Sequence, residues 1–398
     1  MNLIRRIDRV VREGRLVPGA LRRWQAFIDR PLGKVENLKF KQCSPYYPYL
    51  YSDECIRDNR ETVDDSRHAA IIDRIVAAYQ KATSCQERAP QPYQVGTMWR
   101  DIYTRAYGPL MVALQRGDRA VLDQLFRDCF RSEITRGLEM GADYKRYSKG
   151  GGFDDAYTNQ YLRNLHTWLW LFDGSQSLDD LAFPRIGNPF GPVIDGTLIP
   201  RCAIRLHYYA SRIVALLGAG ERPVVAEIGA GFGGVPYHLF KQAGRPLTYI
   251  DFDLPETLAL ASYFLLSAFP DRRVMLFGEG ELSADAIGAH DILLMPNFEL
   301  AKLPDRSVDV FFNSDSLVEM ELDTIREYVN HISRTVRGHF LHVNHDGIDY
   351  TQNLLFRARA SAEFELIAAP RIGTSLRRVQ MIPAYFQSPF HYECLYQN

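Results

Sequence analysis

A buried strand that breaks into a glycine-rich turn constrains the fold of this chain more than any other stretch. Residues 224–228 read VVAEI, and the turn GAGFGG follows at residues 229–234. A helical pattern then runs from Gly234 to Gln242. Glycine allows a sharp turn and a close approach to a ligand because it has no Cβ. The helix N-terminus adds free N–H groups. The stretch therefore predicts a parallel strand, a tight loop and a helix that together bind an adenosine-containing cofactor.

Two interpretations of this loop compete. Gly229, Gly231 and Gly234 satisfy the pattern GxGxxG, which is typical of a dinucleotide site. Glu227 favours another cofactor, because a carboxylate at the end of the strand would crowd a pyrophosphate but suits a cationic amino-acid group. The pattern Glu-x-Gly-x-Gly-x-Gly, which ends at Gly233, resembles motif I of the class I methyltransferases that depend on S-adenosylmethionine (SAM).

Acidic residues end the next predicted strand, residues 246–253. Asp251 and Asp253 lie about where a carboxylate would accept hydrogen bonds from the ribose hydroxyls of either cofactor. One of them could instead cap the helix that starts near Pro255, and Asp253 is the better placed of the two for that role. We favour ribose binding by at least one of these acids.

The order of elements predicts an α/β fold in the second half of the chain. Residues 186–398 alternate strand and helix patterns and end in a strand pair at residues 365–368 and 379–383. Residues 273–277 and 291–295 both read as the third core strand. We predict a class I methyltransferase (Rossmann-like) fold: a doubly wound, mostly parallel sheet with a terminal antiparallel hairpin. Residues 1–185 read as a mainly helical region without a recognisable catalytic motif.

Composition limits the partners and the compartment. The net charge of −1 gives no bulk attraction for nucleic acid, and no apolar run reaches the length of a membrane span. Six cysteines without a CxxC pair favour reduced thiols in the cytoplasm over disulfides or a zinc site. The Arg-rich residues 1–30 suit either an anionic membrane surface or docking on the protein itself, and we favour docking. Nothing in the sequence sets the oligomeric state.

A narrower resemblance lies in the second half of the chain. The strings DILLMPNFELAKL, VDVFFNSDSLVEM, REYVNHI and HFLHVNHDG resemble the sugar O-methyltransferase family of bacterial polysaccharide and glycoside gene clusters. The family segment Asn-Ser-x-Ser-x-x-Glu-Met corresponds here to Asn313, Ser314, Ser316, Glu319 and Met320. The resemblance implies SAM as cofactor and S-adenosylhomocysteine as product. It also implies a small-molecule acceptor with a sugar hydroxyl, on a nucleotide sugar, a glycolipid or polysaccharide, or a glycosylated metabolite.

A sugar hydroxyl must lose its proton to attack a methyl group, so a general base is expected where the strands end. His345 follows the fifth strand, and an imidazole suits a base at neutral pH. Asp315 and Glu319 would orient it or hold a neighbouring hydroxyl. A magnesium alternative would use Asp315, Asn344 and Asp346 as oxygen ligands, but we do not favour it.

Further contacts are expected from the loops around the same crevice. We predict cofactor contacts from Asn297, Phe298, Asn313 and Ser314. The helix that precedes the first strand can fold across the crevice, so we predict substrate contacts from Arg201, His207, Tyr208 and, after the fifth strand, Asn344. Two other functions stay open: an NAD(P)-dependent oxidoreductase, and a catalytically silent SAM-binding scaffold subunit.

Overall fold

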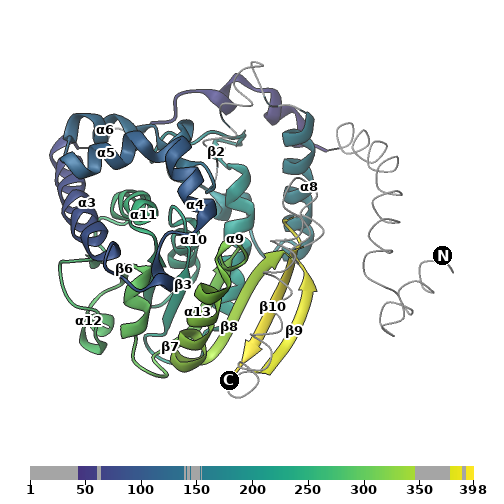
Figure 1. The fold of residues 1–398 in the computed structure, drawn as a ribbon. Coiled ribbons are helices and arrows are strands. Elements are labelled where there is room, and N and C mark those ends of the chain that lie inside the picture. The colour runs from purple at the N-terminus through teal and green to yellow at the C-terminus, as the bar shows by residue number, and fades with distance from the viewer. Residues whose placement is uncertain are drawn as a thin grey trace.

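The computed structural model describes residues 44–60, 64–138, 140, 144, 153, 155–345, 377–387 and 391–398. The first part of the chain is mainly helical, as predicted (Figure 1). Its elements are η1 Tyr47–Tyr51, η2 Asp53–Ile56, α3 Asp65–Gln86, η3 Gln91–Tyr93, α4 Thr97–Ile102, the π-helix η4 Tyr103–Tyr107, α5 Gly108–Arg116, α6 Arg119–Arg127, η5 Cys129–Arg131, η6 Glu133–Thr135, α8 Asp155–Phe172 and η7 Leu178–Leu181. A short ladder of β1 Val193–Ile194 and β2 Thr197–Leu198 leads into the second part.

The second part of the chain builds an eight-stranded sheet in the order β5-β6-β4-β3-β7-β8-β10-β9. Its strands are β3 Val224–Ile228, β4 Thr248–Asp253, β5 Val274–Leu276, β6 Ile292–Pro296, β7 Val308–Ser314, β8 Val336–His345, β9 Arg377–Pro383 and β10 His391–Gln397. The helices between them are α9 Arg201–Leu216, α10 Gly234–Gln242, α11 Pro255–Ala268, α12 Ala284–Ala289, η8 Asn297–Lys302, η9 Leu317–Glu319 and α13 Leu322–Thr335. All pairs from β5 to β8 are parallel, and β10 runs antiparallel to both β8 and β9. The predicted doubly wound sheet with a terminal antiparallel hairpin is confirmed.

Two details of the predicted strand order are settled by the ladder. Residues 292–296 pair with β4, so β6 is the third core strand and β5 lies outside it at the edge. The predicted hairpin partner at residues 365–368 lies outside the described residues. Among the described strands, β9 pairs with the aromatic segment His391–Gln397, which inserts between β8 and β9.

The strand side chains form two apolar layers, one on each face of the sheet, because successive residues of a strand point to opposite faces. One layer packs under α9, α10 and α11 and contains Val225, Tyr249, Val310 and Leu341. The other packs under α12 and α13 and contains Ala226, Ile250, Phe311 and Phe340. The sheet is therefore covered by helices on both faces.

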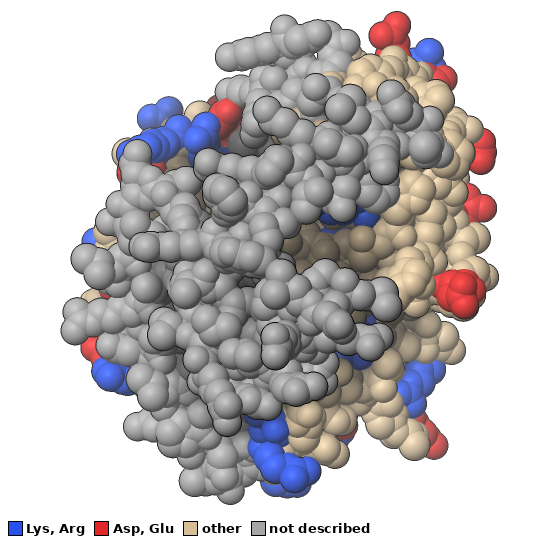
Figure 2. Space-filling model, turned by 90° about the vertical axis from the view of Figure 1, so that its right-hand side faces the viewer, with Lys and Arg blue, Asp and Glu red and all other residues tan. Residues whose placement is uncertain are grey.

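The N-terminal helices share the first of these layers. The ring of Phe126 in α6 stacks on Tyr263 in α11, with 4.8 Å between ring centroids, and α3 lies against α11. One apolar cluster runs from Leu50 to Leu395 and so crosses residue 185, where the sequence predicted a domain boundary. On the described part of the face in Figure 2, acidic and basic side chains are interspersed. None of the described helices is both long enough and apolar enough to cross a bilayer.

Candidate active site

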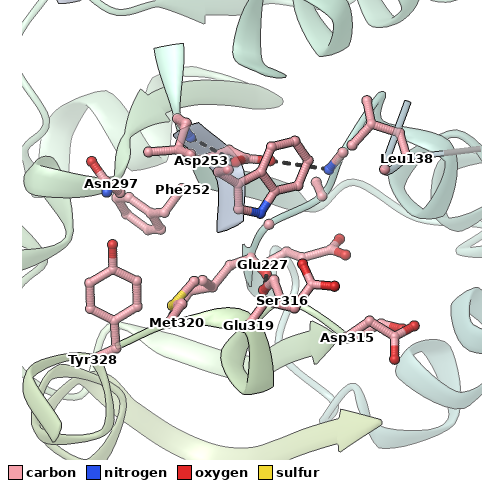
Figure 3. Close-up of a pocket in the computed structure, with 18 of the residues that line it drawn as sticks. Leu138, Glu227, Phe252, Asp253, Asn297, Asp315, Ser316, Glu319, Met320 and Tyr328 are labelled. Atoms are coloured by element: carbon pink, nitrogen blue, oxygen red, sulfur yellow. Dashed lines mark hydrogen bonds between the residues drawn. The ribbon is translucent and has the colours of Figure 1, made fainter. Parts of the chain in front are cut away.

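A cavity opens at the carboxyl ends of the central strands, where β3 and β7 lie side by side. In Figure 3, Asn297 and Tyr328 lie at one end of it and Asp315 at the other, with Glu227 between them. Among the predicted site residues, those that line the cavity are Glu227, Gly229, Gly231, Asp253, Asn297, Ser314, Asp315 and Glu319. Residues far apart in the sequence therefore meet at the edge of the sheet where parallel strands end.

The glycine loop depends on backbone conformations that other residues rarely adopt. Gly229 has φ of 76° and Gly231 has φ of 65°, in the left-handed region that favours glycine. A Cβ on Gly229 would lie 2.5 Å from Oγ of Ser316, so this position also has no room for a side chain. The loop and the segment after β7 thus pack together without a gap.

The N–H groups of this loop are already bonded to the acids of β4. The amide of Ala230 donates to Oδ1 of Asp251 at 3.3 Å, and the amide of Gly231 donates to Oδ2 of Asp253 at 3.2 Å. A dinucleotide site uses such loop amides to bind the pyrophosphate. Because the acids of β4 occupy two of these amides here, the loop offers fewer free donors to an anion than GxGxxG alone would predict.

Glu227 lies at the floor of the cavity and is 2% exposed. Its Oε2 accepts a hydrogen bond from the hydroxyl of Tyr249 at 2.6 Å. Burial raises the pKa of the Glu227 carboxyl to about 8, against the opposing effect of the Tyr249 hydrogen bond. A buried acid of this kind regains its charge when a cation binds beside it.

The two acids of β4 occupy different places. Asp253 lines the cavity, while Asp251 is fully buried beneath the glycine loop and lies outside the cavity lining. Burial raises the pKa of both carboxyls, that of Asp253 to about 7. The amide of Leu254 donates to Oδ1 of Asp253 at 2.7 Å, but Leu254 itself is the N-cap of α11, and that N-cap makes no side-chain capping hydrogen bond. Of the two predicted ribose ligands, only Asp253 therefore lines the cavity.

A polar cluster from three segments of the chain surrounds Asp315. Its Oδ2 accepts a hydrogen bond from Nε2 of Gln387 at 2.6 Å and lies 3.4 Å from Nη1 of Arg205. Nε2 of His391 lies 3.0 Å from Oδ1. Burial pushes the pKa of Asp315 up, but His391, Arg205 and Gln387 outweigh burial and hold it below its ordinary value. Asp315 also has φ of 63°, a strained conformation that is common at functional sites.

The opposite end of the cavity carries aromatic side chains. Tyr328 lines it, and the ring of Tyr93 stacks on Tyr328 with 5.8 Å between centroids. Asn297 donates from Nδ2 to the carbonyl of Tyr93 at 3.0 Å. Nothing among the described residues donates to its buried Oδ1. Phe298 lies outside the cavity lining and packs on Phe277.

The predicted substrate contacts on α9 need a correction. His207 and Tyr208 are buried away from the cavity. Nε1 of Trp168 donates to Nδ1 of His207 at 3.1 Å, and the hydroxyl of Tyr208 donates to Glu393 at 3.0 Å. Arg201 also lies outside the cavity lining, and its guanidinium bonds to Gln160. The residues of α9 that do face the cavity are Arg205, Leu206 and Tyr209.

Three other predicted contacts are structural in this fold. Asn313 is buried and donates from Nδ2 to the carbonyl of Ile228, and Asn344 donates to Oδ1 of Asn313 at 3.0 Å. These amides tie β3, β7 and β8 together below the cavity. Gly233 lies at the start of α10, where a Cβ would meet Leu265 at 2.9 Å. None of these three residues lines the cavity.

Two predicted residues lie at or just beyond the last described residue of β8. His345 is the last residue of β8 and stands opposite His391 in the ladder, but its side chain lies outside the described residues. Asp346, one ligand of the magnesium alternative, is also outside them. Within the described residues, no group of three or more His, Cys, Asp or Glu side chains is arranged to hold a metal ion.

Several cavity residues come from the mainly helical region, where sequence reasoning found no motif. They are Gln94, Gly96, Trp99, Gly137 and Leu138. Their spacing follows no period, because they reach the cavity from one loop, the start of α4 and the turn after η6. Gln387 and His391, which contact Asp315, lie in the C-terminal segment, for which the sequence predicted no site residue.

Comparisons with known proteins give fold likenesses only. No protein family and no curated protein matches this chain. A SAM-dependent methyltransferase from Aquifex aeolicus is 14% identical, with a TM-score of 0.33, over 48% of this chain and 91% of its own. Mitomycin 7-O-methyltransferase MmcR is 14% identical, with a TM-score of 0.33, over 50% of this chain and 56% of its own. Geranyl diphosphate C-methyltransferase from Streptomyces coelicolor A3(2) has the same identity and TM-score over 48% and 78%. At this level of likeness they carry no argument about function.

Proposed function

We propose that this protein is a SAM-dependent O-methyltransferase and that its acceptor is a sugar hydroxyl. The observation that carries the proposal is the buried carboxylate of Glu227 on the floor of the cavity. A raised pKa at this place favours a ligand that brings a positive charge. The ammonium group of a methionine moiety has that charge, whereas the pyrophosphate of NAD(P) has the opposite one.

The remaining polar groups of the cavity fit the other parts of this cofactor. Asp253 would accept a hydrogen bond from a ribose hydroxyl. The unpaired Oδ1 of Asn297 would accept one from the amino group of adenine, next to the ring of Tyr328. When bound, SAM supplies a methyl group on a sulfonium, whose departure leaves a neutral thioether. The protein therefore has to hold the acceptor in line and remove its proton.

The end of the cavity around Asp315 would receive the acceptor. Arg205, Asp315 and Ser314 offer both donors and acceptors there, as a polyhydroxyl ligand requires. The lowered pKa of Asp315 keeps its carboxylate ionised, so it is a weak base that can still accept hydrogen bonds from hydroxyl groups. We propose His345 as the base that takes the hydroxyl proton, with Asp315 and Glu319 orienting it. His391, which contacts Asp315, is a second candidate for this role.

Binding measurements separate SAM from nicotinamide cofactors. In calorimetric titrations we expect S-adenosylhomocysteine to bind with a micromolar Kd, and NAD⁺ and NADP⁺ not to bind. Glu227→Gln should weaken S-adenosylhomocysteine binding by about ten-fold or more, because it removes a buried charge-assisted hydrogen bond. Glu281→Gln changes an exposed residue outside the cavity lining and should leave the Kd unchanged. Binding of a nicotinamide cofactor in place of S-adenosylhomocysteine would overturn the proposal.

Turnover measurements test the roles at the acceptor end. The protein would be incubated with SAM and a panel of nucleotide sugars and glycosides, and S-adenosylhomocysteine formation would be quantified. His345→Ala should lower kcat by about 10²- to 10⁴-fold if it is the base, and Asp315→Ala and Glu319→Ala should lower it as well. The exposed Asp271→Ala serves as control. Wild-type rates in all three variants would remove these assignments, and binding without any turnover would favour the scaffold alternative.

A further inference from the structure

We propose that residues 94–99 and 137–138 form a roof over the SAM site and that the indole of Trp99 contacts the bound cofactor. The inference rests on the proposed function and adds to it a part of the chain without a sequence motif. Gln94, Gly96, Trp99, Gly137 and Leu138 all line the same cavity as the glycine loop.

The roof is continuous from Trp99 to the glycine loop. A Cβ on Gly137 would lie 3.3 Å from Cη2 of Trp99, and a Cβ on Gly231 would lie 3.3 Å from Cδ2 of Leu138. The backbone of Gly137 thus lies against the indole of Trp99, and the backbone of Gly231 lies against the side chain of Leu138. Figure 3 shows Leu138, Asp253 and Glu227 arranged around the cavity. A ligand held by Glu227 and Asp253 therefore has the roof as its opposite wall.

Residues that line the cavity also hold the roof in place. Tyr93, just before the roof, stacks on Tyr328 and receives a hydrogen bond from Asn297 at its carbonyl. Within the roof, Oγ1 of Thr97 donates to Oε1 of Glu321 at 3.0 Å. Tyr328, Asn297 and Glu321 all belong to the cavity lining. The roof and the cofactor cavity therefore depend on the same side chains.

The indole of Trp99 is half-buried and packs against two tyrosine rings that lie outside the cavity lining. Its ring centroid lies 5.6 Å from that of Tyr103 and 6.3 Å from that of Tyr107, both in the π-helix η4. A π-helical turn within a helix is rare and occurs often at functional sites. The indole surface left at the cavity is apolar and rigid, and a ligand that covers it gains contact area at little entropic cost.

Tryptophan emission offers a direct test. The chain has four tryptophans, Trp24, Trp99, Trp168 and Trp170, and S-adenosylhomocysteine serves as the probe. We expect saturation to change the emission of the wild-type protein. Trp99→Phe should lose that change, and Trp170→Phe, a matched change at a residue that is 71% exposed on α8, should keep it. By calorimetry, Trp99→Ala should raise the Kd about ten-fold, the size of effect expected for an aromatic wall.

The outcomes separate this inference from the proposed function. Absence of S-adenosylhomocysteine binding to the wild-type protein contradicts the proposed function itself. If the wild-type protein binds it, an unchanged Kd in Trp99→Ala together with a retained emission change in Trp99→Phe overturns the roof alone. Leu138→Ala is a second variant outside the aromatic cluster, and it should weaken binding with a melting temperature close to that of the wild-type protein. Far-UV circular dichroism establishes that each variant is folded.

Discussion

Glu227 is one of three buried carboxyl groups whose ionisation is costly at this site. It shares the buried space at the ends of β3 and β4 with Asp251 and Asp253, and burial raises the pKa of all three carboxyls. The free protein therefore keeps protons that water would otherwise remove. A cationic ligand reverses this situation at Glu227, so binding and ionisation are linked.

The stability of the protein without ligand should depend on the ionisation of the Glu227 carboxyl. Unfolded chains ionise glutamate near pH 4.3, whereas the folded-state pKa of Glu227 is about 8. Between about pH 5 and about pH 8 the folded state binds a proton that the unfolded state has lost, so stability falls as the pH rises. Glu227→Gln has no such proton. We expect its melting temperature to exceed that of the wild-type protein by a margin that grows over this pH range, measured by calorimetry without ligand. A constant margin would contradict the linkage.

Helix α9 illustrates what the sequence could and could not predict at the level of one element. Its position before the first strand is readable from the pattern of apolar residues, and so is its approach to the crevice. Which face meets the cavity is set by packing: Arg205 and Tyr209, one turn apart, face it, while His207 packs against Trp168. The glycine loop was easier to predict, because Glu227 and Gly229 lie only two residues apart in the sequence and no choice between the faces of a helix is involved.

The C-terminal strand β10 is fastened to α9 by an ion pair in which the carboxylate of Glu393 is buried and the side chain of Arg212 is 26% exposed. Glu393 is 1% exposed, accepts a hydrogen bond from Nε of Arg212 at 2.7 Å and another from the hydroxyl of Tyr208. Glu393→Ala leaves the buried Tyr208 hydroxyl and the Arg212 guanidinium without this partner and should lower the free energy of unfolding by about 1–3 kcal/mol. Urea denaturation measures this loss. The affinity for S-adenosylhomocysteine should stay unchanged, because neither residue lines the cavity. The exposed Glu281→Ala is the control, and an equal loss there would contradict the argument.

At the scale of the molecule, the helical first part and the sheet form one folded body. Phe126 of α6 and Tyr263 of α11 stack within an apolar cluster that crosses the predicted boundary at residue 185. The sequence distinguished the two parts by their periodicity, helical before residue 185 and alternating after it. It could not show that they share a core and a cavity, because contacts between distant segments leave no local pattern. For the same reason Trp99 and His391 escaped prediction.

A shared core predicts one cooperative unfolding transition for the described parts. Tryptophan emission, which includes Trp168 of α8, and far-UV circular dichroism should give the same midpoint in urea. Addition of S-adenosylhomocysteine should shift both midpoints upward together, since ligand binding stabilises the folded state as a whole. Two separated midpoints, or a ligand shift seen by only one probe, would show that the helical part unfolds independently.

The order of strands at the edge of the sheet has a consequence for synthesis. Strand β9 is made before β10, yet its place in the sheet is beside β10, which itself pairs with β8. Among the described strands, β9 has no neighbour in the sheet until the later strand has emerged and joined β8. Gln387 and His391 can contact Asp315 only after β10 has paired with β8. Of the described features, the contacts around Asp315 are thus among those that require β10 to be in place.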